Sequence, residues 1–168
     1  MPLILIEAIE RQQQEVAVTK IKKILAPTDL SKLSRPALRY ALELALERGA
    51  AVIAYHVISE DSEWLGSDDR LNPANALLPQ HRERLHAFMT ENFADLIDKV
   101  EVIELVEAGV PYNKIVEKAQ NEKVDLIVMS THGRTGFEQI LLGSVTAKVV
   151  ARSNCPVLSI RPAKSSAH

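Results

Sequence analysis

The chain has 168 residues, a length that suits one domain and is too short for two sizeable ones. Hydrophobic residues make up 46% and charged residues 25%, the balance of a globular protein, which excludes a disordered or low-complexity chain. Aromatic residues make up only 4%, and 20 basic residues face 22 acidic ones for a net charge of −2. These values argue against stacking on single-stranded nucleic acid and against attraction to nucleic acid or anionic lipid.

The single cysteine, Cys155, excludes an intrachain disulfide and a zinc site built from cysteines, and it indicates a reducing compartment. No apolar run approaches the ~18 residues that a membrane-spanning helix needs. The first ten residues carry Glu7 and Glu10 where a secretory signal would carry a basic segment. We therefore expect a cytoplasmic protein that does not contact a membrane.

Residues 1–19 are expected to form an N-terminal extension. Its apolar start and polar continuation fit either a short arm that docks on the body or on a partner, or a loosely held terminus. Residues 21–26 then predict a short strand that Pro27 ends. The helix that follows has Ser34 as its expected N-cap, Gly49 at its C-terminal end, and a buried stripe made of Leu38, Ala41, Leu42 and Ala45.

Strands and helices alternate through the rest of the chain. The elements expected there are, in chain order, a strand at 51–58, a loop at 59–80, a helix at 81–99, a strand at 100–106, a helix opened by Pro111, a strand at 124–129, a helix after Gly143 and a strand at 156–160. The run 51–58 is almost entirely apolar, as in strands buried on both faces of a parallel sheet. In the helix after Gly143 we expect Ala147, Val150 and Ala151 to face inward.

This alternation predicts an open parallel α/β sheet covered by helices on both faces. Glu101 and Glu104 interrupt the apolar pattern at 100–106, and the strand at 156–160 is the last of the series, so both strands are expected at sheet edges. In sheets of this kind, ligands bind beyond the carboxyl ends of the strands, where the winding reverses. The functional site should therefore lie at these strand ends.

Two strand ends carry the candidate site. After the strand at 124–129, three of the chain's six glycines lie between positions 133 and 143, and Ser144 follows the last of them. Glycine lets backbone N–H groups approach a ligand closely, and the helix that starts after Gly143 offers unpaired N–H groups and a positive dipole end. This pattern fits a phosphate-binding loop. It fits equally a glycine-rich turn that only connects a strand to a helix.

Asp29 follows the first strand and offers a carboxylate that could accept hydrogen bonds from an adenine amino group or a ribose hydroxyl. The alternative is an aspartate that caps the following loop or helix. His132 lies in the glycine loop and could orient the loop or a phosphate. His56 lies inside an apolar strand, where a hydrogen-bonded core residue is expected, and Cys155 is expected to be a small core residue.

Several nucleotide and hydrolase motifs are absent. No lysine precedes Ser144, so the glycine loop is not a P-loop, and no GxGxxG follows the first strand. No GxSxG elbow occurs, and the histidines show no HxxxH or HExxH spacing, which argues against a metal site. From Ser144 onward the chain has no acid, a pattern expected of a solvated positive face; its basic residues there are Lys148, Arg152, Arg161 and Lys164.

Five separated motifs stand out along the chain. They are Ile24-Leu25-Ala26-Pro27-Thr28-Asp29-Leu30-Ser31, His56-Val57-Ile58, the stretch 124–136 (VDLIVMSTHGRTG), Leu142-Gly143-Ser144-Val145 and Cys155-Pro156-Val157-Leu158. In their residues, order and spacing they resemble the motifs of the universal stress protein family. The resemblance spans residues 20–162 and leaves the extension 1–19 and a tail at 163–168 outside it. It implies a five-stranded sheet in the order 3-2-1-4-5 and a homodimer formed through the last strand, which runs from Pro156 to Ile160.

The resemblance also implies the ATP-binding branch of the family, whose mark is G-x2-G-x9-G-[ST]. Gly133, the nine residues after it and Gly143-Ser144 match this pattern, whereas Ser130 stands in place of the first glycine. By the same matching, Asp29 and Val57 would contact adenine. The other residues implied around the adenine, the ribose and the phosphates are Pro27, Thr28, Met129, Ser130, His132, Gly133, Arg134, Thr135, Gly143, Ser144 and Val145.

The function expected from these observations is a cytoplasmic, ATP-binding regulatory protein of the stress response. AMP or ADP are alternative ligands, and Mg²⁺ would accompany the phosphates. Any ATP hydrolysis is expected to be slow, because the P-loop lysine and a clear water-positioning base are missing. A nucleotide-free dimeric interaction module of the same fold is the main alternative. An adenylyl-transferring enzyme is a third one, which rests on fold analogy alone.

Overall fold

The structure of the chain is a computed structural model. It describes residues 20–59, 76–131 and 142–162, so the predicted extension, the predicted tail and most of the predicted loop lie outside the described residues. The elements of the described residues are, in chain order, β1 (Lys23–Pro27), α2 (Arg35–Arg48), β2 (Ala51–Ser59), α3 (Leu78–Phe93), β3 (Val102–Gly109), α4 (Pro111–Asn121), β4 (Leu126–Ser130), α5 (Ser144–Arg152) and β5 (Val157–Ile160).

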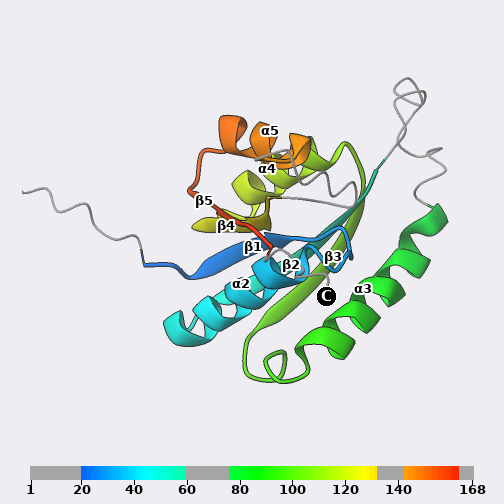
Figure 1. Cartoon of the computed structure of the whole chain (residues 1–168), viewed down its shortest axis with the longest axis vertical. Helices are drawn as coiled ribbons and strands as arrows, with labels where there is room; N and C mark the ends of the chain where they lie inside the picture. The colour runs from blue at the N-terminus through cyan, green and yellow to red at the C-terminus, as the bar shows by residue number, and fades with distance from the viewer. Residues whose placement is uncertain (1–19, 60–75, 132–141, 163–168) are drawn as a thin grey trace, which may run out of the picture.

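The strands form one parallel sheet in the order β3-β2-β1-β4-β5, which confirms the predicted strand order. β1 lies at the centre, where Ile24 pairs with Val52 of β2 on one side and with Leu126 of β4 on the other. β3 and β5 are the edges, as predicted. α2 and α3 cover one face of the sheet, and α4 and α5 cover the other (Figure 1).

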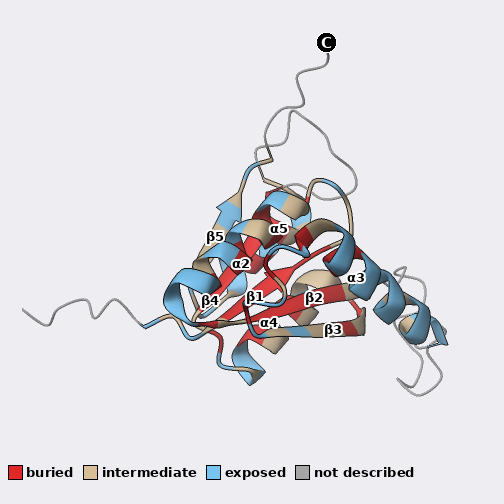
Figure 2. Ribbon diagram, turned by 90° about the horizontal axis from the view of Figure 1, so that it is seen from below, coloured by how far each residue is buried: buried red, intermediate tan, exposed pale blue. Residues whose placement is uncertain are grey.

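The core consists of two apolar layers, one on each face of the sheet. Successive residues of a strand point to opposite faces, so Ile24 packs toward α2 and α3 whereas Leu25 packs toward α4. β2 is apolar on both of its faces, as the run at 51–58 predicts, and Figure 2 shows the central strands as largely buried. The two apolar layers thereby fix the positions of the strands and of their polar carboxyl ends.

α2 forms as predicted, with one difference at its N-terminus. Its apolar stripe is buried, and Gly49 ends it with φ at 63°, a conformation that glycine adopts at low cost. Ser34 holds the N-cap position, but its hydroxyl does not cap the helix. Its backbone lies in the αR region, with φ at −82° and ψ at −17°, instead of the extended conformation typical of a capping residue, and the hydroxyl donates to the carbonyl oxygen of Ser31 at 2.9 Å.

α3 is displaced toward the N-terminus relative to its predicted extent. It begins at Leu78 and ends at Phe93, and residues 94–99 form turns instead of the last part of a helix at 81–99. Leu96 in these turns is still buried and packs against the same apolar layer. The apolar spacing therefore continued beyond the helix and could not mark its end.

The prediction for the inner face of α5 is wrong. Ala147, Val150 and Ala151 are exposed, and the buried residues of this helix are Thr146 and Val149. Thr146 takes an inner position because its hydroxyl donates to the carbonyl oxygen of Ser130 at 2.8 Å. A hydrogen-bonded threonine can be buried at little cost, and apolar periodicity gives no sign of it.

Candidate functional site

A cavity of about 490 Å³ opens at the carboxyl ends of β1, β2 and β4, beside the N-termini of α4 and α5. It lies at the point where the chain order of the strands reverses, between β1 and β4, as expected for ligand sites of open α/β sheets. Its volume falls within the range of small-molecule sites, about 300–1,000 Å³. The walls are both apolar and polar: alongside Pro27 and Val57 stand the side chains of Asp29 and Ser144.

Most of the residues expected at the site do lie on this cavity. Those on its wall are Pro27, Thr28, Asp29, Val57, Met129, Ser130, Gly143, Ser144 and Val145. The other four residues of the prediction lie outside the described part of the chain: His132, Gly133, Arg134 and Thr135. The two turns that the sequence singled out therefore meet at one cavity. The role of each residue toward a ligand stays a prediction.

A chain of hydrogen bonds fixes the loop after β1. The Leu30 N–H donates to the hydroxyl oxygen of Thr28 at 3.0 Å, and the Ser34 hydroxyl donates to the Ser31 carbonyl. Because the Ser34 proton is used there, the Thr28 hydroxyl is the donor in its 2.8 Å contact with Ser34. The Thr28 N–H in turn donates to the Tyr55 carbonyl at 2.8 Å, which ties the loop to β2.

Asp29 uses its two carboxylate oxygens differently. Oδ1 accepts the Ser31 N–H at 3.0 Å, so the aspartate does cap the loop, as the alternative interpretation holds. Oδ2 is buried and has no hydrogen-bond partner among the described residues. A buried acceptor without a donor is unfavourable, and it marks the place where a ligand donor would be stabilised.

The end of β4 connects both loops of the site. The Ser130 hydroxyl donates to the Leu33 carbonyl at 2.9 Å, in the segment that leads into α2. The Gly143 N–H donates to the Thr131 carbonyl at 2.7 Å, which draws the start of α5 against the strand. Gly143 is the N-cap of α5 and offers no side chain to the first-turn N–H groups, so these donors lack a side-chain cap at the cavity.

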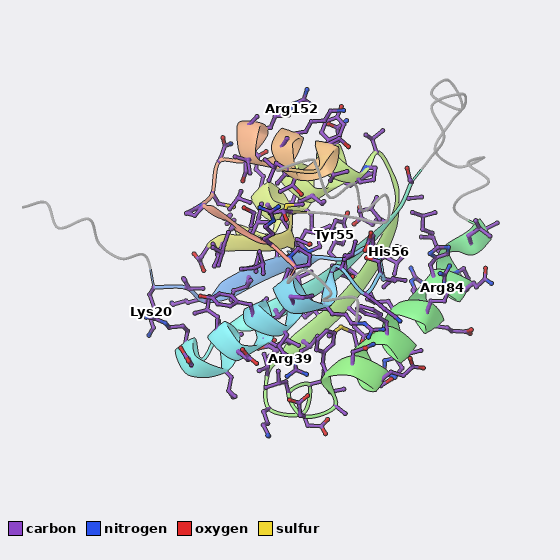
Figure 3. All side chains as sticks on the ribbon, in the orientation of Figure 1. Lys20, Arg39, Tyr55, His56, Arg84 and Arg152 are labelled. Atoms are coloured by element: carbon purple, nitrogen blue, oxygen red, sulfur yellow. The ribbon has the colours of Figure 1, made fainter. Side chains whose placement is uncertain are left out.

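A histidine pair lies on the α3 side of the cavity. His56 Nδ1 lies 2.9 Å from the Thr28 carbonyl oxygen, and because a carbonyl only accepts, Nδ1 carries a proton. His56 Nε2 lies 2.9 Å from His81 Nδ1, and the two rings are nearly parallel, with 6° between their planes. His56 is thus a buried, hydrogen-bonded residue, as predicted (Figure 3). His81 lies 25 residues further along the chain, and no spacing rule links it to His56.

An ionic network lies on the opposite face of β2 from His56. The Tyr55 hydroxyl donates to Glu107 Oε2 at 3.0 Å, and Lys118 forms an ion pair with the other carboxylate oxygen. Burial raises the pKa of Tyr55, and the neighbouring Glu107 carboxylate raises it further. Burial also acts to raise the pKa of Glu107, but the hydrogen bonds from Lys118 and Tyr55 outweigh it, so that pKa is lowered.

The described parts of the chain contain neither a candidate metal centre nor a membrane-spanning helix. Within residues 20–59, 76–131 and 142–162, no group of three or more His, Cys, Asp or Glu side chains could hold a metal ion. No helix in these ranges is long and apolar enough to cross a membrane. Cys155 is partly buried and packs against the apolar layer of α4 and α5, with its sulfur 3.4 Å from the Ser153 hydroxyl.

Comparison with known proteins places this architecture in one family. The model of the universal stress protein family matches residues 20–161. Universal stress protein MJ0531 of Methanocaldococcus jannaschii is 37% identical over 153 residues, and the match covers 85% of this chain and 84% of that protein. The solved structure of MJ0577 is 33% identical with a TM-score of 0.73, and the match covers 87% of this chain and 99% of that one.

A further solved structure is that of a universal stress protein in complex with cAMP. It is 25% identical to this chain, with a TM-score of 0.56, and the match covers 85% of this chain and 98% of that one. The sequence match, the strand order and the position of the cavity agree with one another. The chain therefore belongs to the universal stress protein family.

Proposed function

We propose that the cavity binds an adenine nucleotide, with ATP as the main ligand and ADP or AMP as alternatives. The observation that carries this proposal is the buried Oδ2 of Asp29, an acceptor without a donor on the wall of a nucleotide-sized cavity. An adenine amino group is a donor of the required kind. The start of α5, which has no side-chain cap, provides donors for an anion on the same cavity.

The rest of the site suits the parts of a nucleotide. Pro27 and Val57 offer apolar surface to the base, and Met129 and Ser130 would border the ribose. Gly143 and Ser144 would hold the phosphates with the first-turn amides of α5 and the Ser144 hydroxyl, and Mg²⁺ would arrive with the phosphates. That a universal stress protein 25% identical to this chain forms a complex with cAMP, itself an adenine nucleotide, supports the same ligand class here.

The role of the bound nucleotide would be regulatory. ATP in the cavity would contact both the loop after β1 and the start of α5, because the two lie on different walls of the same cavity. Hydrolysis would be slow, since the sequence has no P-loop lysine and no clear water-positioning base. The protein would act in the cytoplasm.

Homodimerisation would occur through β5. Ile127 and Thr131 donate their N–H groups to the carbonyls of Pro156 and Ile160, so residues 156, 158 and 160 face β4 with their backbone groups. The N–H and C=O groups of the alternate residue Ser159 then point away from the sheet, at an edge that invites pairing. Ser159→Pro removes one of these donors and should shift the mass measured by light scattering from dimer toward monomer, whereas Ser159→Ala should not.

Nucleotide binding is tested by the contents of the purified protein and by titration. Denatured protein should release an adenine nucleotide in mass spectrometry, and calorimetry should show ATP binding by the emptied protein. Asp29→Ala should weaken ATP binding about ten-fold or more, because a buried hydrogen bond is worth about 1–3 kcal/mol. Asp98→Ala, which removes an exposed carboxylate far from the cavity, is the matched control. Equal affinities of both variants and the parent would place the site elsewhere.

A nucleotide-free interaction module is the second candidate function. Ser130 in place of the first motif glycine is the observation that favours it. A protein that releases no nucleotide, does not bind millimolar ATP and still forms a dimer would establish the module in place of the nucleotide site.

A further inference from the structure

We propose that Lys148 binds the distal phosphates of the nucleotide and makes this protein prefer ATP and ADP over AMP. This inference rests on the proposed function and goes beyond it, because it assigns the choice among adenine nucleotides to a residue outside the glycine motif. Lys148 is exposed and does not line the cavity itself. We infer its place beside the start of α5, where the phosphates would bind, from the packing of α4 against α5.

The position of Lys148 is set by two helix starts. Pro111 begins α4 and Ser144 begins α5, and both line the cavity. Tyr112 is the next residue of α4, and Lys148 lies one turn after Ser144, about 6 Å along the helix axis. The ammonium of Lys148 lies 4.7 Å from the centre of the Tyr112 ring, so the two helix starts are joined by this contact.

The direction of the side chain brings its charge nearer to the cavity. Side chains of a helix lean toward its N-terminus, so Lys148 covers the turn that begins with Ser144. Tyr112 packs against the same apolar layer as Val145, which is on the cavity wall. Tyr112 follows Pro111, which lines the cavity, so the ring holds the ammonium beside the first turns of α4 and α5.

Within the described parts of the chain, no carboxylate neutralises the charge of Lys148. Arg152 lies four residues further on and places its guanidinium carbon 4.7 Å from the same ring centre, and two like charges at this spacing repel each other. Neither cation forms an ion pair with a carboxylate of the described residues, whereas Lys114 and Lys118 of α4 both do. The residues from 144 onward contain no acid. This pair of cations would therefore attract an anionic ligand.

The number of phosphates on the ligand decides whether Lys148 would contact it. The phosphate next to the ribose would be held by the amides at Gly143 and Ser144, and AMP has no other phosphate. The second and third phosphates of ADP and ATP would extend beyond these amides and carry additional negative charge, which a compact ammonium recognises as a point charge. Arg152 lies beside the same ring, but its guanidinium is engaged by the Asn113 side-chain oxygen, to which it donates at 3.4 Å.

The test compares Lys148→Gln with Lys20→Gln in the full chain, by calorimetric titration with ATP, ADP and AMP at one salt concentration. Both variants lose one positive charge, and Lys20 lies near the amino end of β1, far from Arg152 and α5 (Figure 3). We expect Lys148→Gln to weaken ATP binding about ten-fold, ADP binding to a smaller extent and AMP binding less than about two-fold, where ten-fold corresponds to about 1.4 kcal/mol. Lys148→Arg should retain most of the preference for ATP.

Equal losses for ATP and AMP, or ATP binding as tight as that of the Lys20→Gln control, would overturn this inference and leave nucleotide binding intact. Failure of the proposed function looks different, because the parent chain itself would then bind none of the three nucleotides, and both proposals would fall together.

Discussion

The network of Tyr55, Glu107 and Lys118 supports β2, which lines the cavity through residues 55–59, and its removal should lower the stability of the fold. In Glu107→Ala the buried Tyr55 hydroxyl loses its acceptor, which costs about 1–3 kcal/mol. The ion pair with Lys118 adds at most about 1 kcal/mol, because the Glu107 side chain is 34% exposed and solvent screens the pair. We expect a total loss of about 1–4 kcal/mol for Glu107→Ala, and about 1 kcal/mol for Glu107→Gln, which keeps an acceptor.

The pH dependence of this loss has a definite sign. The pKa of Glu107 is lowered in the folded protein, so its carboxylate stabilises the fold above the unfolded pKa of about 4.3. This contribution disappears as the pH falls through the lowered pKa, because the protonated side chain then gains nothing from folding. The difference in unfolding free energy between the parent and Glu107→Gln should therefore be full at pH 7 and shrink below about pH 4.

Urea unfolding followed by circular dichroism measures both quantities. Glu117→Gln is the matched control. Glu117 forms an ion pair with Lys114 at 3.7 Å, but its side chain is 60% exposed and the Tyr55 hydroxyl donates to Glu107 instead. We expect almost no change in that variant. A loss in Glu107→Ala as small as in the control, or a loss in Glu107→Gln that is the same at pH 3 and pH 7, would refute the reasoning.

Three further substitutions act on the loops of the site. Ser130→Gly should cost about 1 kcal/mol in thermal unfolding, because the hydroxyl that donates to the Leu33 carbonyl is lost; unchanged stability would contradict that role. His56→Phe should cost about 1–3 kcal/mol, since the Thr28 carbonyl loses its donor, and a stable variant with parental ATP affinity would show that the pair is dispensable. Gly143→Val should fold normally, because its φ of −62° suits any residue, yet weaken ATP binding about ten-fold in calorimetry.

The fold could be predicted because local and long-range signals agree in this chain. The apolar run at 51–58 fits a strand buried on both faces, and Gly49 and Pro111 mark the end of one helix and the start of another. Each of these signals determines the structure only of the residues next to it in the sequence. The face of α5 could not be predicted in this way, because the burial of Thr146 depends on the carbonyl of Ser130, sixteen residues earlier.

The candidate site was predictable to the extent that it consists of strand ends. Residues 27–29 and 143–145 are placed on one cavity by strand order alone, because β1 and β4 are neighbours. His81 and Glu107 are different, since each meets β2 through a partner 25 or 52 residues away in sequence. No spacing rule connects such distant positions. His81 reaches β2 because α3 packs on one face of the sheet, and Glu107 reaches it because β3 pairs with β2.

Ser130 shows how a substitution in a motif changes meaning once its contacts are known. In the sequence pattern it interrupts a series of glycines, and a side chain at that point would hinder the approach of a ribose phosphate. Its hydroxyl, however, donates to the Leu33 carbonyl, while its own carbonyl accepts from Thr146 of α5. One residue thus joins the segment before α2 to the start of α5, the two sides between which the nucleotide would lie. The serine side chain would thus hinder the phosphate, while its hydrogen bond keeps the two sides at a fixed distance. Ser130→Gly should separate these two effects, because it should lower the stability of the fold without lowering the affinity for ATP.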